Sequence, residues 1–282
     1  KEGIVTADYP LMLLDETKRK AFDGLVAHLR SPEAQKEITL RTLRRPVSQE
    51  VEPAPGIPRK TLVELPFPAS REVLDGLIDA YQGQLRRPAS TYFVVDTSGS
   101  MEGEGIEQLR SALAALAGAD ASLTGRFARF QTRERVYLLP FTDTPGNPVR
   151  FDMPESGAQA GPTLDRIQAI ASQLSAGGGT AIFASVQVAL EAAQEDRRKA
   201  PERQYSIVVM TDGKNEHGMQ EREFVQWYEG LDETRRGIPV FGLLFGNAQK
   251  SQLERIAELT GGRVFDARKS LKVAFKEIRG YQ

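Results

Sequence analysis

Short apolar runs alternate with amphipathic segments along residues 89–282. The apolar runs have the length and continuity of strands buried in a parallel sheet, and they lie at 92–96, 135–141, 205–211, 240–245 and 263–266. Between them, apolar residues recur every three or four positions, which predicts helices at 105–116, 162–174, 181–195, 222–231, 250–259 and 270–279. A further strand, 149–153, follows turn-forming residues and is expected at an edge. The pattern predicts an α/β fold: a doubly wound, mainly parallel six-stranded sheet with one antiparallel edge strand and helices on both faces.

The first part of the chain follows a different, mainly helical pattern. A short strand is predicted at 9–14 and a helix at 16–29. Ser31-Pro32-Glu33 then begins a second helix, with Ser at the cap and Pro at the first helical position. A proline-rich stretch, 46–58, precedes a helix at 71–85, for which Ser70 is the predicted cap.

These changes of pattern predict two boundaries. Residues 1–45 form an N-terminal region, 46–88 a proline-rich linker with one helix, and 89–282 the α/β domain. The apolar faces of the amphipathic helices in the first part need cover, because exposed they would promote association. We therefore expect 63–85 to pack on the α/β domain, and 2–42 to dock beside it or to pair with a second copy.

Composition narrows the classes of function only a little. The chain has 282 residues, of which 40% are hydrophobic and 27% charged, and its formal net charge of -1 gives no electrostatic footprint for nucleic acid. The absence of cysteine excludes disulfides, thiolate metal sites and cysteine nucleophiles. No stretch reaches the roughly 20 apolar residues of a membrane helix, so no membrane insertion of this chain is expected. No signal peptide is visible, and a start at Lys1-Glu2-Gly3 is expected of a trimmed or mature product.

Oxygen-bearing side chains follow two of the predicted strands. Asp96, Ser98 and Ser100 occupy every second position directly after the apolar run that ends at Val95. Asp212 follows another predicted strand, and because parallel strands end at the same edge of a sheet, the two carboxylates can reach one ion. Hard anionic and neutral oxygens suit Mg²⁺, Mn²⁺ or Ca²⁺.

A glycine run, 177–179, brings a third hydroxyl, that of Thr180, to the start of a predicted helix. Taken one loop at a time, these hydroxyls have an alternative to metal binding: the serines or Thr180 could cap the helix that follows. The run could also cradle phosphate, but it lacks the Gly-Lys-Ser/Thr ending of a nucleotide loop. Glu216 and His217 could rim the site or belong to a solvated loop. The three segments that carry Asp96 and the serines, Thr180, and Asp212 occur together and in order along the chain. This combination favours the metal site.

The order Asp-x-Ser-x-Ser, then a distant Thr, then a distant Asp, resembles the metal-ion-dependent adhesion site of the von Willebrand factor type A family. The resemblance covers residues 89–282 and implies the Rossmann-like fold of that family. It also implies a divalent ion held by Ser98, Ser100 and Thr180, with Asp96 and Asp212 contributing directly or through water. The open coordination position would then take an Asp or Glu carboxylate of a protein partner.

The N-terminal run, from Asp8-Tyr9-Pro10-Leu11 to Ser31-Pro32-Glu33-Ala34-Gln35, resembles the closing segment of bacterial extracellular solute-binding proteins. The remnant is too short to form such a domain alone. The resemblance implies a bacterial protein of the extracellular space or the cell envelope. It could be a lipoprotein, whose signal this sequence does not include.

Two classes of function compete. The first is a cation-dependent adhesion or protein-binding module with no catalytic residue. The second is a metal-assisted hydrolase or phosphoryl-transfer enzyme that uses Asp96. The enzyme is disfavoured because Ser98 stands where a second carboxylate would be expected and no motif fixes a general acid or base. A lesser possibility is a solute-binding component of a transport system. The sequence leaves open the ion, the protein ligand and the oligomeric state.

Overall fold

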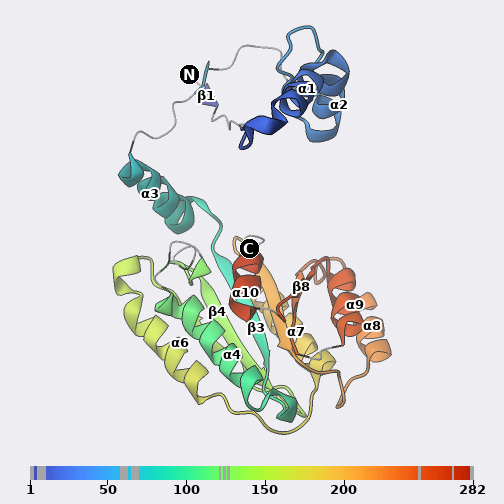
Figure 1. Ribbon diagram of the computed structural model, residues 1–282. Helices are drawn as coiled ribbons and strands as arrows, with labels where there is room; N and C mark the ends of the chain where they lie inside the picture. Colours follow the sequence, from blue (N-terminus) through green and yellow to red (C-terminus); the bar gives the residue numbers. More distant parts are fainter. Residues whose placement is uncertain are drawn as a thin grey trace. The chain divides into compact units, whose positions relative to one another are not determined.

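A computed structural model of the protein describes residues 3–4, 11–57, 63–64, 70–120, 122, 125, 128–246, 249–268 and 270–279 (Figure 1). The chain divides into two compact units, Lys1–Asp75 and Gly76–Gln282. The predicted boundaries near residues 45 and 88 stay predictions. Among the described residues, no helix combines the length and the apolar character needed to cross a bilayer.

The second unit is built on a six-stranded sheet. Its strands follow the order β5-β4-β3-β6-β7-β8, and all neighbours pair in parallel except β5, which is antiparallel to β4 at the edge. This confirms the predicted sheet, including its antiparallel edge strand. The strands are β3 (Ala89–Asp96), β4 (Arg135–Phe141), β5 (Val149–Asp152), β6 (Gln204–Thr211), β7 (Val240–Leu244) and β8 (Val264–Asp266).

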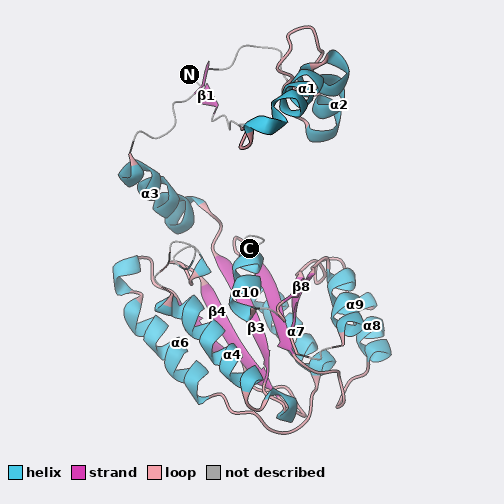
Figure 2. Cartoon of the chain, viewed as in Figure 1, coloured by secondary structure: helices cyan, strands magenta, loops and turns pink. Residues whose placement is uncertain are grey.

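Helices cover both faces of this sheet, as the sequence predicts (Figure 2). Because side chains alternate along a strand, Phe93 and Val95 face one apolar layer with α4, α6 and α10, whereas Tyr92 and Val94 face another with α7, α8 and α9. The helices are α4 (Glu104–Ala114), α6 (Gly161–Gln173), α7 (Ile182–Lys199), α8 (Glu221–Glu229), α9 (Lys250–Thr260) and α10 (Leu271–Arg279).

The topology places a crevice at the ends of β3 and β6. From β3 the chain builds β4 and β5 on one side, and it then returns to place β6 on the other side of β3. At such a reversal of strand order the loops after the two neighbouring strands diverge to opposite faces of the sheet. All eight residues of β3 are buried, so this central strand is a fixed base for the loop that follows it.

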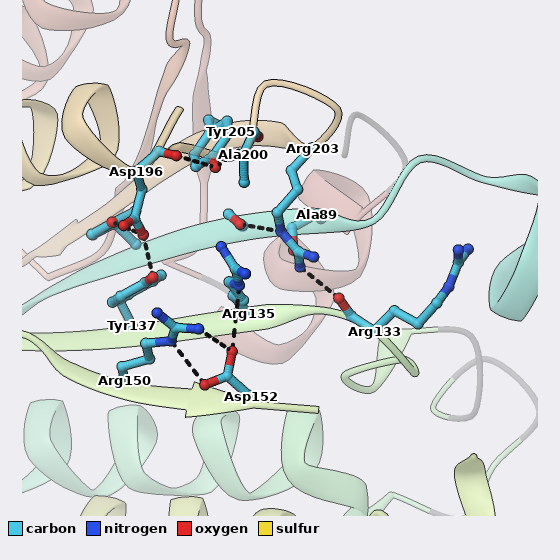
Figure 3. Close-up of polar contacts among 12 residues, drawn as sticks. Ala89, Arg133, Arg135, Tyr137, Arg150, Asp152, Asp196, Ala200, Arg203 and Tyr205 are labelled. Carbon is cyan, nitrogen blue, oxygen red and sulfur yellow. Dashed lines mark hydrogen bonds and ion pairs between the residues drawn. The ribbon is translucent and has the colours of Figure 1, made fainter. Parts of the chain in front are cut away.

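A polar network joins the strands at the other end of the sheet, near the first residues of β3 and β6 (Figure 3). The guanidinium of Arg203, 9% exposed, donates to the carbonyl oxygen of Ala89 and to Ser90 Oγ, each at 2.8 Å, and to the carbonyl oxygen of Arg133. The rings of Tyr92 and Tyr137 stack with centroids 4.0 Å apart, and both hydroxyls donate to Asp196 near the end of α7. The far end of α7 is therefore tied to β3 and β4.

The first unit contains the two predicted helices. A 3₁₀ turn, Glu16–Lys18, leads into α1 (Arg19–Arg30), and α2 (Pro32–Thr42) begins at Ser31, whose Oγ accepts the N–H of Ala34 at 3.2 Å. The predicted strand at 9–14 falls partly outside the described residues, and its described part, 11–14, is not a strand. A parallel pair that the pattern did not predict joins β1 (Gly3–Ile4) to β2 (Val63–Glu64).

The described part of the proline-rich stretch, 46–57, is tied to α2. The N–H of Val47 donates to Gln35 Oε1 at 2.8 Å, and the N–H of Ala54 donates to Thr39 Oγ1 at 3.0 Å. Ala54 is buried, as are both side chains on α2. This stretch is therefore ordered along the helix surface.

The helix after this stretch is also present, as α3 (Arg71–Ala80) followed by a π-helical turn, Tyr81–Leu85. Ser70 Oγ accepts the N–H of Val73 at 3.3 Å, which confirms the predicted cap. No residue of α3 is buried. The packing of 63–85 on the α/β domain stays a prediction.

Replacing Thr39 with Val should free the proline-rich stretch, because the buried N–H of Ala54 loses its acceptor while the side chain keeps its volume. We expect the Ala54 amide to exchange its hydrogen about fivefold faster, the equivalent of one lost hydrogen bond of about 1 kcal/mol. Thr42→Val on the exposed side of the same helix is the matched control and should leave this rate unchanged. Equal exchange in the two variants would contradict the anchoring role of Thr39.

Candidate functional site

The carboxylate of Asp96 lies beneath the crevice, at the end of β3. Its side chain is fully buried. Its Oδ1 accepts the N–H of Ser98 at 2.8 Å, and its Oδ2 accepts the hydroxyl of Thr211, the last residue of β6, at 2.6 Å. Because both oxygens are engaged, the carboxylate is held in one orientation between the two strand ends.

Burial raises the pKa of Asp96, and the nearby carboxylate of Asp212 raises it further. The hydrogen bonds from Ser98 and Thr211 act in the opposite direction, because they favour the ionised form, but burial is the larger effect. Among the described residues, no Lys, Arg or His forms an ion pair with Asp96 or Asp212. Neither carboxylate is therefore paired with a basic side chain in the described part of the site.

The two serines connect these carboxylates. Ser98 Oγ and Ser100 Oγ are 3.1 Å apart, and Ser100 Oγ donates to Asp212 Oδ1 at 2.8 Å. Neither hydroxyl caps a helix: Ser98 makes no side-chain cap bond to the 3₁₀ turn Gly99–Met101, and α4 starts after Gly103. The helix-cap alternative for these serines is therefore wrong.

Thr180 joins the same group of side chains from the glycine loop. A Cβ built on Gly213 would lie 3.6 Å from both Thr180 Oγ1 and Ser100 Oγ, so the two hydroxyls flank this glycine. Thr180 is not a helix cap either, because Ala181 occupies that position before α7. The N–H of Gly99 donates to the carbonyl oxygen of Gly178 at 2.8 Å, which fastens the glycine loop to the serine loop.

A surface depression of about 560 Å³ opens above these groups. Its lining includes three of the five predicted residues, and the other two, Asp96 and Ser98, are buried. All five predicted residues therefore belong to one region at the edge of the sheet. The depression is lined by Ser100, Gly178, Thr180, Asp212, Gly213, Lys214, Glu216 and Gln249.

Three residues that support the site were not predicted from the sequence. Thr211 orients Asp96, as described above. Asn215 accepts the N–H of Phe183 at the start of α7 through its Oδ1, at 3.2 Å, and donates from Nδ2 to the carbonyl oxygen of Met219 at 3.0 Å. Asp143 follows the end of β4 and contacts the glycine loop. Its position after a strand is visible in the sequence and could have marked it.

The five predicted side chains offer only oxygen atoms, two carboxylates and three hydroxyls. The described residues contain no group of three or more His, Cys, Asp and Glu side chains that could hold a metal ion. The five predicted residues themselves supply no nitrogen or sulfur ligand, the kinds that favour zinc and copper. An oxygen-only set suits Mg²⁺, Mn²⁺ or Ca²⁺.

Comparisons with known proteins agree with the fold of the second unit. The model of the von Willebrand factor type A domain matches residues 91–279. An uncharacterized protein from Synechocystis sp. is 27% identical over 137 residues, which are 49% of this chain and 28% of that protein.

Two solved structures are also similar. The first, described as von Willebrand factor type A from Catenulispora acidiphila, has a TM-score of 0.52 at 17% identity and covers 68% of this chain and 42% of its own. The second, proximal thread matrix protein 1 from the mussel byssus with a zinc-occupied MIDAS motif, has a TM-score of 0.46 at 16% identity, over 69% of this chain and 45% of its own. This chain spans less than half the length of each of the three relatives.

Proposed function

Because the chain belongs to the von Willebrand factor type A domain family, we propose that its strand-end loops bind a divalent cation and, through it, a carboxylate of a protein partner. The observation that carries this proposal is the bond from Ser100 Oγ to Asp212 Oδ1, which joins the serine loop to the second carboxylate. Together with Asp96 beneath them, these groups concentrate negative charge and oxygen donors at one point.

The residues present fit a cation. Ser98, Ser100 and Thr180 would hold it through hydroxyl oxygens, and Asp96 and Asp212 would contribute directly or through water. Ser100 donates its proton to Asp212 and accepts from Ser98, which leaves one lone pair of its hydroxyl for a cation. A bound dication would also offset the cost of burying Asp96.

The proposed mechanism of binding is electrostatic. Asp96 and Ser98, which are buried, and the hydroxyls beside them would hold the ion, and the surface depression leaves room for a partner. An incompletely neutralised dication attracts a carboxylate more strongly than a surface ammonium does, because it carries twice the charge at a short distance. The preferred ion is Mg²⁺, with Mn²⁺ and Ca²⁺ as alternatives.

The hydrolase or phosphoryl-transfer alternative is not favoured by any observation at the site. An aspartyl nucleophile must reach its substrate, yet Asp96 is fully buried and both of its oxygens accept hydrogen bonds. The solute-binding role likewise rests on the N-terminal resemblance alone. That resemblance supports a bacterial extracellular or cell-envelope location, in secreted or lipoprotein form, which we include in the proposal.

The proposal is tested by capturing partners from a cell-envelope extract on the immobilised protein. We expect capture in Mn²⁺ or Mg²⁺, release by a chelator, and loss of capture when Ser100 is replaced with Ala. The control is Asp165→Ala, which removes an exposed carboxylate on α6 and should leave capture unchanged. For an identified partner, changing the relevant Asp or Glu should abolish binding. Partners that bind equally in chelator would point to another face of the domain.

A further inference from the structure

Asp143 lies outside the five-residue pattern but holds the loop that carries Thr180. It follows the end of β4, and its Oδ1 accepts the N–H of Gly179 at 2.6 Å. The carbonyl oxygen of the preceding residue, Thr142, accepts the N–H of Ala181 at 2.9 Å. Thr180 is therefore held by one hydrogen bond on the residue before it and another on the residue after it.

The contacts around Asp143 leave no room for side chains at Gly178 and Gly179. A Cβ on Gly179 would lie 2.1 Å from His217 Cδ2 and 2.6 Å from Asp143 Oδ1, and a Cβ on Gly178, whose φ is +77°, would lie 2.9 Å from Asp143 Oδ2. The N–H of His217 donates to the carbonyl oxygen of Thr180 at 3.1 Å. The loops after β4 and β6 thus contact the glycine loop from two sides.

We propose that Asp143 is a positioning residue that sets the place of the Thr180 hydroxyl for the cation, an inference that rests on the proposed function. Three successive glycines make a loop with large conformational freedom, so an unanchored loop would present its hydroxyl in many positions. The bond from Gly179 to Asp143 removes part of that freedom. Residues that orient metal ligands without touching the metal commonly change the affinity for it by about 10-fold to 100-fold.

The test is the Mn²⁺ affinity of the full chain, measured by calorimetric titration. Asp143→Ala should lower the affinity about tenfold. Asp143→Asn should bind almost as well as the wild type, because its Oδ1 still accepts the N–H of Gly179. Equal losses of Mn²⁺ affinity in the two variants would overturn the proposal, because they would show that the negative charge of Asp143, and not its hydrogen bond to Gly179, affects the affinity. Asp165→Ala, which removes the same charge from α6, is the matched control and should change nothing.

A double-mutant cycle then asks whether Asp143 acts through Thr180. In a Thr180→Ala background, Asp143→Ala should cause no further loss of Mn²⁺ affinity, and a full additive loss would overturn the proposal. Should the Ala variant not fold, Asp143→Ser gives the same comparison. A wild type that binds no Mn²⁺ would overturn the proposed function as well, whereas normal binding by both the wild type and Asp143→Ala would overturn only the role of Asp143.

Discussion

Replacing Asp212 with Ala should abolish most of the affinity for Mg²⁺ and Mn²⁺ while leaving the fold intact. The change removes one of two carboxylates and the acceptor of the Ser100 hydroxyl. Because the affinity of oxygen sites for dications depends strongly on ligand charge, we expect a loss of at least about 100-fold. Asp212 is only partly buried and follows β6, so the sheet itself loses no contact.

Calorimetric titration with each ion measures the affinity, and thermal unfolding in a chelator measures the fold. The unfolding temperature of the metal-free variant should equal or exceed that of the wild type, since Asp212 contributes to the raised pKa of Asp96 through repulsion. Asp165→Ala is again the control. If Asp212→Ala binds the ions as tightly as the wild type, Asp212 does not contribute to cation binding and the proposed metal site is wrong.

The sheet could be predicted because its central strands are continuous apolar runs and the edge strand β5 follows a clear turn signal. The continuous apolar run before Asp96 specifies a central strand, and the alternation of strands and helices leaves few topologies. The two carboxylates could be placed together for the same reason. Parallel strands bring their carboxyl ends to one edge whatever the details of the loops.

The supporting residues could not be predicted, because their roles depend on contacts between distant loops. Thr211 looks like any strand threonine until its hydroxyl is seen to donate to Asp96, 115 positions away. Thr39 in α2 looks like an ordinary helix residue until the chain folds back to bring Ala54 against it. The pairing of β1 with β2 joins two-residue segments, which are too short to leave a periodic pattern.

Replacing Asp96 with Asn should stabilise the metal-free protein at neutral pH and remove its response to Mg²⁺. Burial is the main cause of the raised pKa of Asp96, so the ionised form is disfavoured in the folded state. Between the ordinary aspartate pKa and this raised value, the folded protein binds more protons than the unfolded chain. The contribution of Asp96 to the free energy of unfolding therefore falls as the pH rises from the ordinary aspartate pKa to the raised value. Above the raised value the whole of that contribution is lost.

Asparagine has nearly the shape of aspartate and can keep both contacts. Its Oδ1 can accept the N–H of Ser98, and its Nδ2 can donate to the hydroxyl of Thr211 in place of the bond that Asp96 accepts. The variant thus removes the buried charge without opening a cavity. We expect a gain of about 1 kcal/mol in the free energy of unfolding at pH 7 in a chelator, and a smaller gain at acidic pH, because protonation removes the buried charge from the wild type as well.

Saturating Mg²⁺ should reverse the order of the two proteins. A ligand at 100 times its Kd stabilises the wild type by about 2.7 kcal/mol, whereas Asp96→Asn should gain little because it has lost an anionic group of the site. Thermal unfolding of both proteins at two pH values, each with Mg²⁺ and with chelator, measures the effect of the buried charge and the effect of the ion, and Asp165→Asn is the exposed control. A metal-free Asp96→Asn protein less stable than the wild type at pH 7 would show that the hydrogen bonds to the ionised carboxylate outweigh its burial. The site would then be held together by its own bonds, without need of a cation.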